Sequence, residues 1–160
     1  MLFMETAFLC LLFFAICYLN TGSDEKNIKS YDSYPDEIQD SLKNNPVLAP
    51  KIKTVSTATS FFSNLVTFII VFLILGVFIR ENDFTTNFLN ILFMGEVLNA
   101  FDFLVIDLLW WRNSPRIRFS STKNEPQLYK SINKHFTSFL RGAVVFLLVA
   151  IIDGFILSIF

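Results

Sequence analysis

Four long apolar runs constrain this chain more than any other feature of its sequence. They extend over residues 2–19, 61–79, 88–111 and 136–160. The hydrocarbon core of a bilayer is about 30 Å thick, so a spanning helix needs roughly 20 apolar residues. The runs have helix length and lack the alternation that is typical of membrane β-strands. The sequence therefore predicts an all-α integral membrane protein with four transmembrane helices, forming a single membrane domain over residues 1–160.

The first run is either a retained helix or a signal peptide. No Lys or Arg precedes its apolar part, Glu5 does, and no small-x-small cleavage motif follows it. We therefore expect a retained helix. Its cysteines, Cys10 and Cys17, lie about 10 Å apart along a helix axis, too far for a disulfide, and we interpret them as small buried apolar residues.

The positions of Lys and Arg predict the orientation, because cytoplasmic loops carry an excess of them. The net charge of the chain is only −1 and indicates no partner by itself. The loop 112–135 holds six bases against the single acid Glu125, so we expect it to be cytoplasmic. The loop 20–60 is then cytoplasmic as well, and both termini face outward.

The first loop predicts a short helix over residues 35–44. Pro35 suits a first helical turn, and Tyr34, Ile38 and Leu42 recur every four residues to form a narrow apolar stripe. Two interpretations are open. The helix lies on the protein's own membrane base, or it docks a cytosolic partner.

The second loop begins with aromatic and basic residues that suit a membrane interface. Tryptophans gather at headgroup level, and each base near an anionic surface contributes about 1 kcal/mol. The residues expected there are Trp110, Trp111, Arg112, Arg116 and Arg118. The partner predicted from them is a bilayer with anionic headgroups. One short loop without a Gly-rich turn favours neither nucleic acid nor nucleotide.

Acids within the last two runs are the candidate functional residues. In an antiparallel helix pair, two residues at the same depth have sequence numbers that add to a nearly constant sum. Asp107 with Arg141 gives 248, and Glu96 with Asp153 gives 249. One register therefore predicts a structural ion pair, Asp107–Arg141, and a pair of carboxyls that shares a proton or binds a cation.

Other uses of that register are open. Gly95 and Gly154 also give 249, so the two helices could close on these glycines and turn the acids toward another helix or protomer. On a helical wheel Asn99 lies between the directions of Glu96 and Asp102. The transport or ion-binding candidates are Glu96, Asn99, Asp102 and Asp153, with Asp102 lacking any evident partner.

No motif in the chain indicates catalysis, a cofactor or a metal. His135 is the only histidine, no cysteine is spaced with it as a metal ligand, and we interpret it as an interfacial residue. No Ser-His-Asp order, Walker loop or HExxH stands in the sequence. We expect no metal and no cofactor, and the chain does not look like an enzyme.

The stretch from Trp110, "WWRNSPRIRFSSTKNEPQLYKSINKHFTSFLRG", resembles the C-terminal part of small bacterial multi-pass membrane proteins often labelled ABC transporter permease. The shared features are the Trp-Arg pair after an acidic span, Arg-x-Arg, a Tyr, a His and Phe-Leu-Arg-Gly. The similarity covers about the last third of the chain. Residues 119–125 read "FSSTKNE" where those proteins carry a Pro-Gly-Thr-Glu-Asp-like stretch. The resemblance implies a bacterial plasma-membrane protein of unestablished biochemistry.

Three functions are compatible with these features. The first is a transport or permeation component with an acid-lined intramembrane site for protons or cations, as a homo-oligomer or as a subunit of a larger transporter. The second is a non-catalytic accessory or assembly subunit that docks partners through its cytoplasmic loops. The third is an enzyme acting on lipid, which needs Asp107, His135 and the arginines of the second loop to converge.

Overall fold

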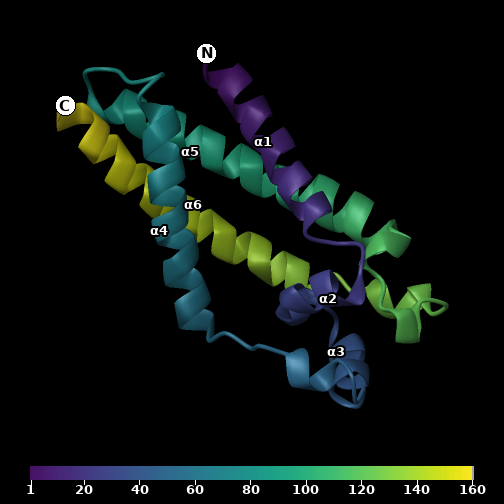
Figure 1. Cartoon of the computed structure of the whole chain (residues 1–160). Helices are drawn as coiled ribbons and strands as arrows, with labels where there is room; N and C mark the ends of the chain where they lie inside the picture. Colours follow the sequence, from purple (N-terminus) through teal and green to yellow (C-terminus); the bar gives the residue numbers. More distant parts are fainter. Residues whose placement is uncertain (160) are drawn as a thin grey trace. The chain divides into compact units, whose positions relative to one another are not determined.

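The structure is a computed structural model that describes residues 1–159, and the regular secondary structure of these residues is all helical (Figure 1). Four helical stretches are long and apolar enough to cross a membrane: Leu2–Leu19, Thr57–Gly76, Phe84–Asn113 and Pro126–Ile159. The prediction of an all-α chain with four candidate spans is therefore confirmed. The long helices are α1 (Leu2–Leu19), α4 (Thr57–Gly76), α5 (Phe84–Phe101) and α6 (Asn133–Ile159).

Shorter helices occupy the loops. Helix α2 is Asp24–Asn27 and α3 is Asp36–Lys43, and α5 continues as a π-helix, η3 (Asp102–Trp110). Short 3₁₀ helices cover Ile28–Ser33, Ala49–Lys51, Trp111–Asn113, Pro115–Ile117, Ser120–Thr122 and Pro126–Tyr129. The helix predicted over 35–44 is thus present as α3.

Polar caps explain why two spans begin before their apolar runs. The hydroxyl of Ser56 accepts a hydrogen bond from the Thr59 backbone N–H at 3.1 Å, so α4 begins at Thr57. The carboxylate of Asp83 accepts from the Thr86 backbone N–H at 2.9 Å, so α5 begins at Phe84. Each cap satisfies a donor that the first turn leaves open.

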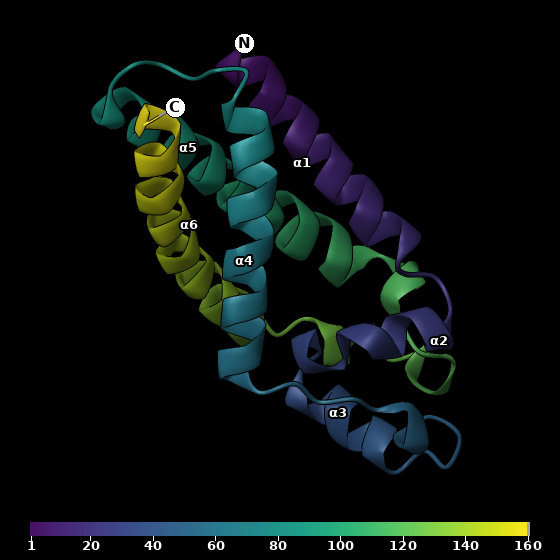
Figure 2. The same ribbon diagram turned by 60° about the vertical axis from the view of Figure 1, so that its left-hand side comes forward.

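The chain divides into two compact units. Unit 1 comprises residues 1–11, 55–101 and 139–160, and unit 2 comprises residues 12–54 and 102–138. The predicted single membrane domain stays a prediction. In unit 1, the beginning of α1, the loop 77–83 and the C-terminal end of α6 lie at the same end (Figures 1 and 2).

Helices α5 and α6 of unit 1 approach closely at their glycines. A Cβ atom on Gly95 would lie 2.8 Å from the Phe146 side chain, and one on Gly154 would lie 2.9 Å from the Phe88 Cα. The numbers of facing residues therefore add to 241 or 242, whereas 248 or 249 was predicted. The predicted register is wrong by about seven residues, or about 10 Å.

Aromatic packing explains this correction. Each of these glycines receives a phenylalanine of the opposite helix, so the predicted Gly95–Gly154 contact does not form. Phe146 also stacks on Phe72 of α4, with ring centroids 5.6 Å apart, and contacts Phe68 at 4.7 Å. A ring that fills a glycine notch and joins a third helix fixes a register that charge matching did not reveal.

Gly154→Ala is expected to destabilise unit 1 by about 1–3 kcal/mol, because the added methyl meets the Phe88 backbone, which cannot rotate away. The measurement is the unfolding midpoint of the purified protein in detergent. Gly76→Ala is the matched control, since its methyl meets only the movable side-chain ends of Leu157 and Ile91 and should leave the midpoint nearly unchanged. Equal effects of both substitutions would contradict the proposed packing.

The two loops of unit 2 fold around one aromatic and aliphatic core. The apolar stripe of the predicted loop helix is buried, with an exposed fraction of at most 1% for each of Tyr34, Ile38 and Leu42. They pack with Ile117 and Phe119 of the second loop. Burial raises the pKa of the Tyr34 phenol. The stripe is therefore covered by the protein's own second loop, and α3 does not expose it for docking. Its position on a membrane base stays a prediction.

Polar contacts hold this unit together. The Tyr34 hydroxyl donates to the Ile117 carbonyl at 2.8 Å, and the Tyr129 hydroxyl accepts from the Phe119 backbone N–H at 3.0 Å. On the surface, the Lys134 Nζ lies 2.8 Å from the Asp36 carboxylate. This hydrogen bond lowers the pKa of Asp36, so its contribution is lost as pH falls through that lowered pKa.

Tyr34→Phe is expected to destabilise unit 2 by about 1–3 kcal/mol, because it removes a buried hydrogen bond and strands the Ile117 carbonyl. The measurement is the protease resistance of the loops during thermal unfolding. Tyr31→Phe is the control, because the hydrogen bond of the Tyr31 hydroxyl to the Gln39 carbonyl is long, at 3.4 Å, and only partly buried. A control variant that loses as much resistance as Tyr34→Phe would refute the assigned bond.

Candidate functional site

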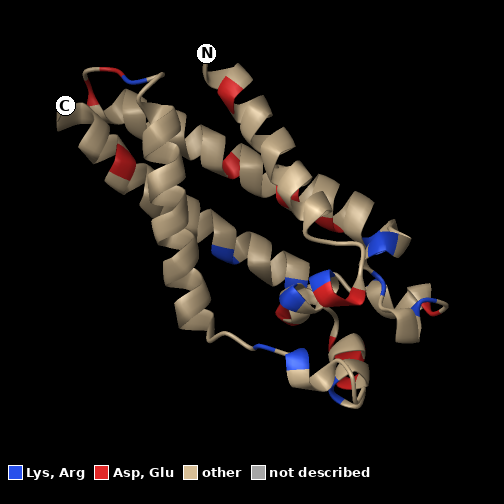
Figure 3. Cartoon of the chain, in the orientation of Figure 1, with Lys and Arg blue, Asp and Glu red and all other residues tan. Residues whose placement is uncertain are grey.

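The buried carboxyl of Asp153 is the most unusual polar group of unit 1. The residue is fully buried in α6, and neither carboxyl oxygen has a hydrogen-bond partner among the described residues. Figure 3 shows how few acidic or basic residues the helices of this unit carry. A carboxylate without a counter-ion at such a position costs several kcal/mol, so it needs a proton, a cation or a polar ligand.

Asn99 forms a polar contact between α5 and α6. Its Nδ2 donates to the Phe139 carbonyl at 3.1 Å and to the Glu96 Oε2 at 3.4 Å. Its Oδ1 packs against Gly142, where a larger residue would not fit. The structure therefore brings together Glu96 and Asn99, as the helical spacing predicted.

The predicted pair of Glu96 and Asp153 is not formed. In the observed register Asp153 is level with Phe88 or Leu89, and Glu96 is level with Val145 or Phe146. The two acids are separated by about 11 Å along the helix axes. Asp153 therefore stands as a separate buried acid, and Glu96 is oriented by Asn99.

Glu5 is a partly buried acid that the sequence analysis did not consider as a candidate. Its Oε2 is buried and has no hydrogen-bond partner within residues 1–159. The residue lies in α1, where its neighbour Thr6 is also buried. The signal was available, since Glu5 is the only acid in that apolar run. Glu5 is a second unit 1 carboxyl whose charge the described residues do not balance.

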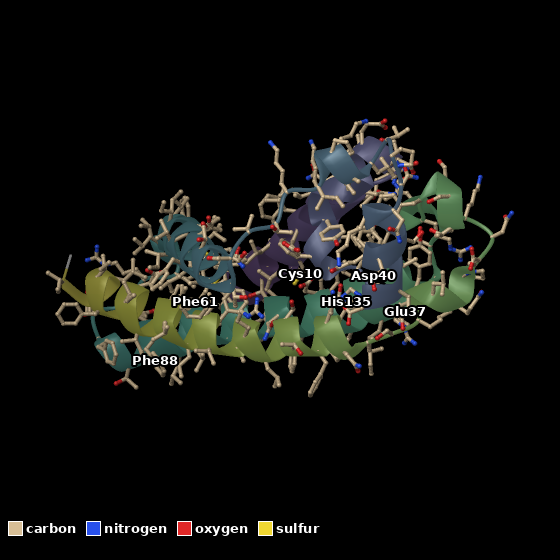
Figure 4. The ribbon with its side chains drawn as sticks, turned by 90° about the horizontal axis from the view of Figure 1, so that it is seen from below. Cys10, Glu37, Asp40, Phe61, Phe88 and His135 are labelled. Carbon is tan, nitrogen blue, oxygen red and sulfur yellow. The ribbon has the colours of Figure 1, made fainter. Side chains whose placement is uncertain are left out.

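In unit 2 the structure pairs Asp107 with His135. The His135 Nδ1 lies 2.9 Å from the Asp107 Oδ1, and both side chains are largely buried. Figure 4 labels His135 near the start of α6. The predicted partner of Asp107, Arg141, belongs to unit 1, so the Asp107–Arg141 ion pair stays a prediction. Sequence reasoning treated His135 as interfacial and considered its convergence with Asp107 only for the enzyme alternative.

Asp102 belongs to the same cluster through the π-helix. Residues five apart point about 140° apart on an α-helix, whereas i→i+5 bonding brings Asp102 and Asp107 toward one face. Asp102 interacts electrostatically with both Asp107 and His135. The acid that lacked a partner in the sequence is therefore a neighbour of the Asp107–His135 pair. Short π-helical segments are frequent at functional sites.

The aromatic and basic residues predicted at the membrane interface largely contact the protein itself. Trp110 packs edge-on against Phe14, with centroids 5.4 Å apart. The Arg116 guanidinium lies 4.0 Å from the centre of the Tyr18 ring and donates to the Tyr18 carbonyl. Arg118 donates to the Lys123 carbonyl at 3.5 Å. Their role toward lipid stays a prediction.

Two nitrogens of this interface lack partners. Trp111 Nε1 and Arg112 Nε are buried without a hydrogen-bond acceptor in the described part of the chain. Within residues 1–159, no three His, Cys, Asp or Glu side chains are grouped to hold a metal ion.

A scan of known protein families, a search of curated proteins and a search of solved structures each found no match to this chain.

Asp153→Val is expected to raise the stability of unit 1 by about 1–3 kcal/mol, because an apolar side chain removes an unpartnered buried carboxyl. Asn99→Val should lower it by about 1 kcal/mol, because Asn99 makes hydrogen bonds that valine cannot. Chemical unfolding in detergent micelles measures both. Loss of stability in Asp153→Val would reveal a stabilising partner of the carboxyl and would contradict this description.

Proposed function

We propose that this protein is a multi-pass membrane protein that moves protons or cations through an intramembrane acidic site. The single observation that carries the proposal is Asp153, which is fully buried in a candidate span with both carboxyl oxygens unpartnered in the described structure. Ionisable residues at such positions are costly, and in membrane proteins they mark proton relays and ion pathways.

The chemistry of Asp153 supports exchange better than permanent charge. A carboxyl that no base neutralises is stable there when it carries a proton or a cation, and it becomes costly when that charge leaves. Each loss of the proton or cation therefore favours uptake of another one. If access to Asp153 alternates between the two sides of the membrane, that uptake comes from the opposite side. Glu96, held by Asn99, and Glu5 are further acids of the same unit that could bind the transported ion.

We further propose that the protein acts as a homo-oligomer or as a subunit of a larger transporter. Only 6% of the apolar window of α4 is buried, and Phe62, Val66, Ile70 and Ile74 are exposed. Lipid or neighbouring transmembrane helices would cover this face. The excess of bases in loop 112–135 supports a cytoplasmic position for it in a bacterial plasma membrane, with both termini outside.

An accessory role without transport is the alternative. The burial of the α3 stripe removes one of the two surfaces that this alternative uses for docking and leaves the basic second loop.

Asp153→Asn is expected to reduce ion flux to the level of protein-free liposomes, because an amide cannot release a proton or neutralise a cation. The measurement is the internal pH of liposomes that contain the purified protein, under an imposed pH gradient or K⁺ diffusion potential. Asp83→Asn is the control, because Asp83 caps α5 in an exposed loop and asparagine caps equally well. Wild-type flux in Asp153→Asn would refute the proposal, provided both variants elute as the native protein does.

A further inference from the structure

The Asp107–His135 pair fixes the proton of the imidazole. Nδ1 lies 2.9 Å from the Asp107 Oδ1, which is a hydrogen-bond distance. A carboxylate only accepts, so Nδ1 carries the proton and Nε2 of a neutral ring presents its lone pair. His135 is 5% exposed, and its Nε2 is buried without a partner among residues 1–159. Unit 2 thus holds an oriented, buried proton acceptor that its own residues leave unused.

A donor without a partner lies beside this acceptor. The ring of Trp111 packs edge-on against that of His135, with centroids 6.1 Å apart. Trp111 is 7% exposed, and its Nε1–H is also buried and unpartnered in the described chain. Leaving either group unsatisfied costs about 1–3 kcal/mol. A single group that both accepts and donates a hydrogen bond would satisfy both nitrogens.

The chemistry of the surroundings selects that group. A phosphate or carbonyl oxygen could accept from Trp111 but would face the lone pair of Nε2. An anion would also be repelled by Asp107 and by Asp102, which interacts electrostatically with the pair. A cation could bind Nε2 but would be repelled by the indole N–H. A hydroxyl group satisfies both nitrogens, because its oxygen accepts from Trp111 while its hydrogen is donated to His135.

We propose that His135, Asp107 and Trp111 form a binding site for a hydroxyl group, in which Nε2 of His135 accepts the hydrogen bond. The hydroxyl comes from a lipid headgroup alcohol or from water, and both present the same chemistry. Asp107 holds the imidazole in the tautomer whose Nε2 accepts this bond. Binding of the hydroxyl is independent of ion movement at Asp153.

Nitrogen NMR tests the site directly, because His135 is the only histidine and gives one pair of ring signals. The full-length protein, labelled with ¹⁵N-histidine, is reconstituted at neutral pH. We expect a protonated Nδ1 and an unprotonated Nε2 whose signal is displaced toward that of a hydrogen-bonded nitrogen. Trp111→Phe should move the Nε2 signal, and Asp107→Asn should convert part of the ring to the Nε2–H form. Asp40→Asn, at an exposed acid of α3, should change neither.

Two vesicle compositions separate the sources of the hydroxyl. Phosphatidylglycerol carries headgroup hydroxyls, whereas phosphatidylcholine carries none. An Nε2 signal that differs between the two vesicles identifies the lipid alcohol, and one that is the same in both but loses its hydrogen-bonded position in Trp111→Phe identifies water. Either result supports the site. A protonated Nε2 in the wild-type protein, or an Nε2 signal that Trp111→Phe leaves unmoved, would overturn the proposal.

Discussion

The close approach of α5 and α6 is the constraint on which the rest of unit 1 depends. Gly95 and Gly154 leave room for Phe146 and the backbone at Phe88, and Gly142 leaves room for the Asn99 amide. Apolar side chains gain little by leaving lipid for protein, so helices in membranes associate through close packing and hydrogen bonds. The glycine notches therefore decide which polar groups meet. They place Asn99 of α5 within reach of the Phe139 carbonyl of α6, and they leave Asp153 without a partner among the described residues.

Unit 2 depends on a different interaction, the burial of an aromatic core by two loops. Tyr34 and Tyr129 bury their rings while their hydroxyls bond to the second loop, so each residue contributes apolar area without an unsatisfied group. The same unit contains the π-helical segment with Asp102 and Asp107, and the His135 imidazole. In both units the polar groups that the packing satisfies brace the fold, and those that it leaves unsatisfied are the candidates for chemistry.

Hydropathy was sufficient to predict the four spans, because span length and apolar composition are properties of local sequence. Capping by Ser56 and Asp83 accounts for the differences at the helix starts. The register was not predictable from charge matching, because the decisive contacts are between glycines and phenylalanines. The sequence has five glycines and twenty phenylalanines, so many such pairs are possible. Asp107 and His135 also add to 242, so a search for His as well as Arg partners would have found the pair. The sequence identified Asp153 as a candidate, but it paired Asp153 with Glu96, whereas the structure leaves both of its carboxyl oxygens without a partner among the described residues.

The central claim is that α5 and α6 meet in the register that leaves Asp153 alone. Spin labels test it at exposed positions of the two helices once Cys10 and Cys17 are replaced by serine. Phe93, Leu147 and Phe155 are all exposed. In the observed register a label at 93 lies nearly level with one at 147, and a label at 155 lies about 12 Å further along α6. A shorter distance for 93–147 than for 93–155, by electron double resonance in liposomes, is the predicted result. A shorter distance for 93–155 would restore the register that pairs Glu96 with Asp153 and would contradict this account.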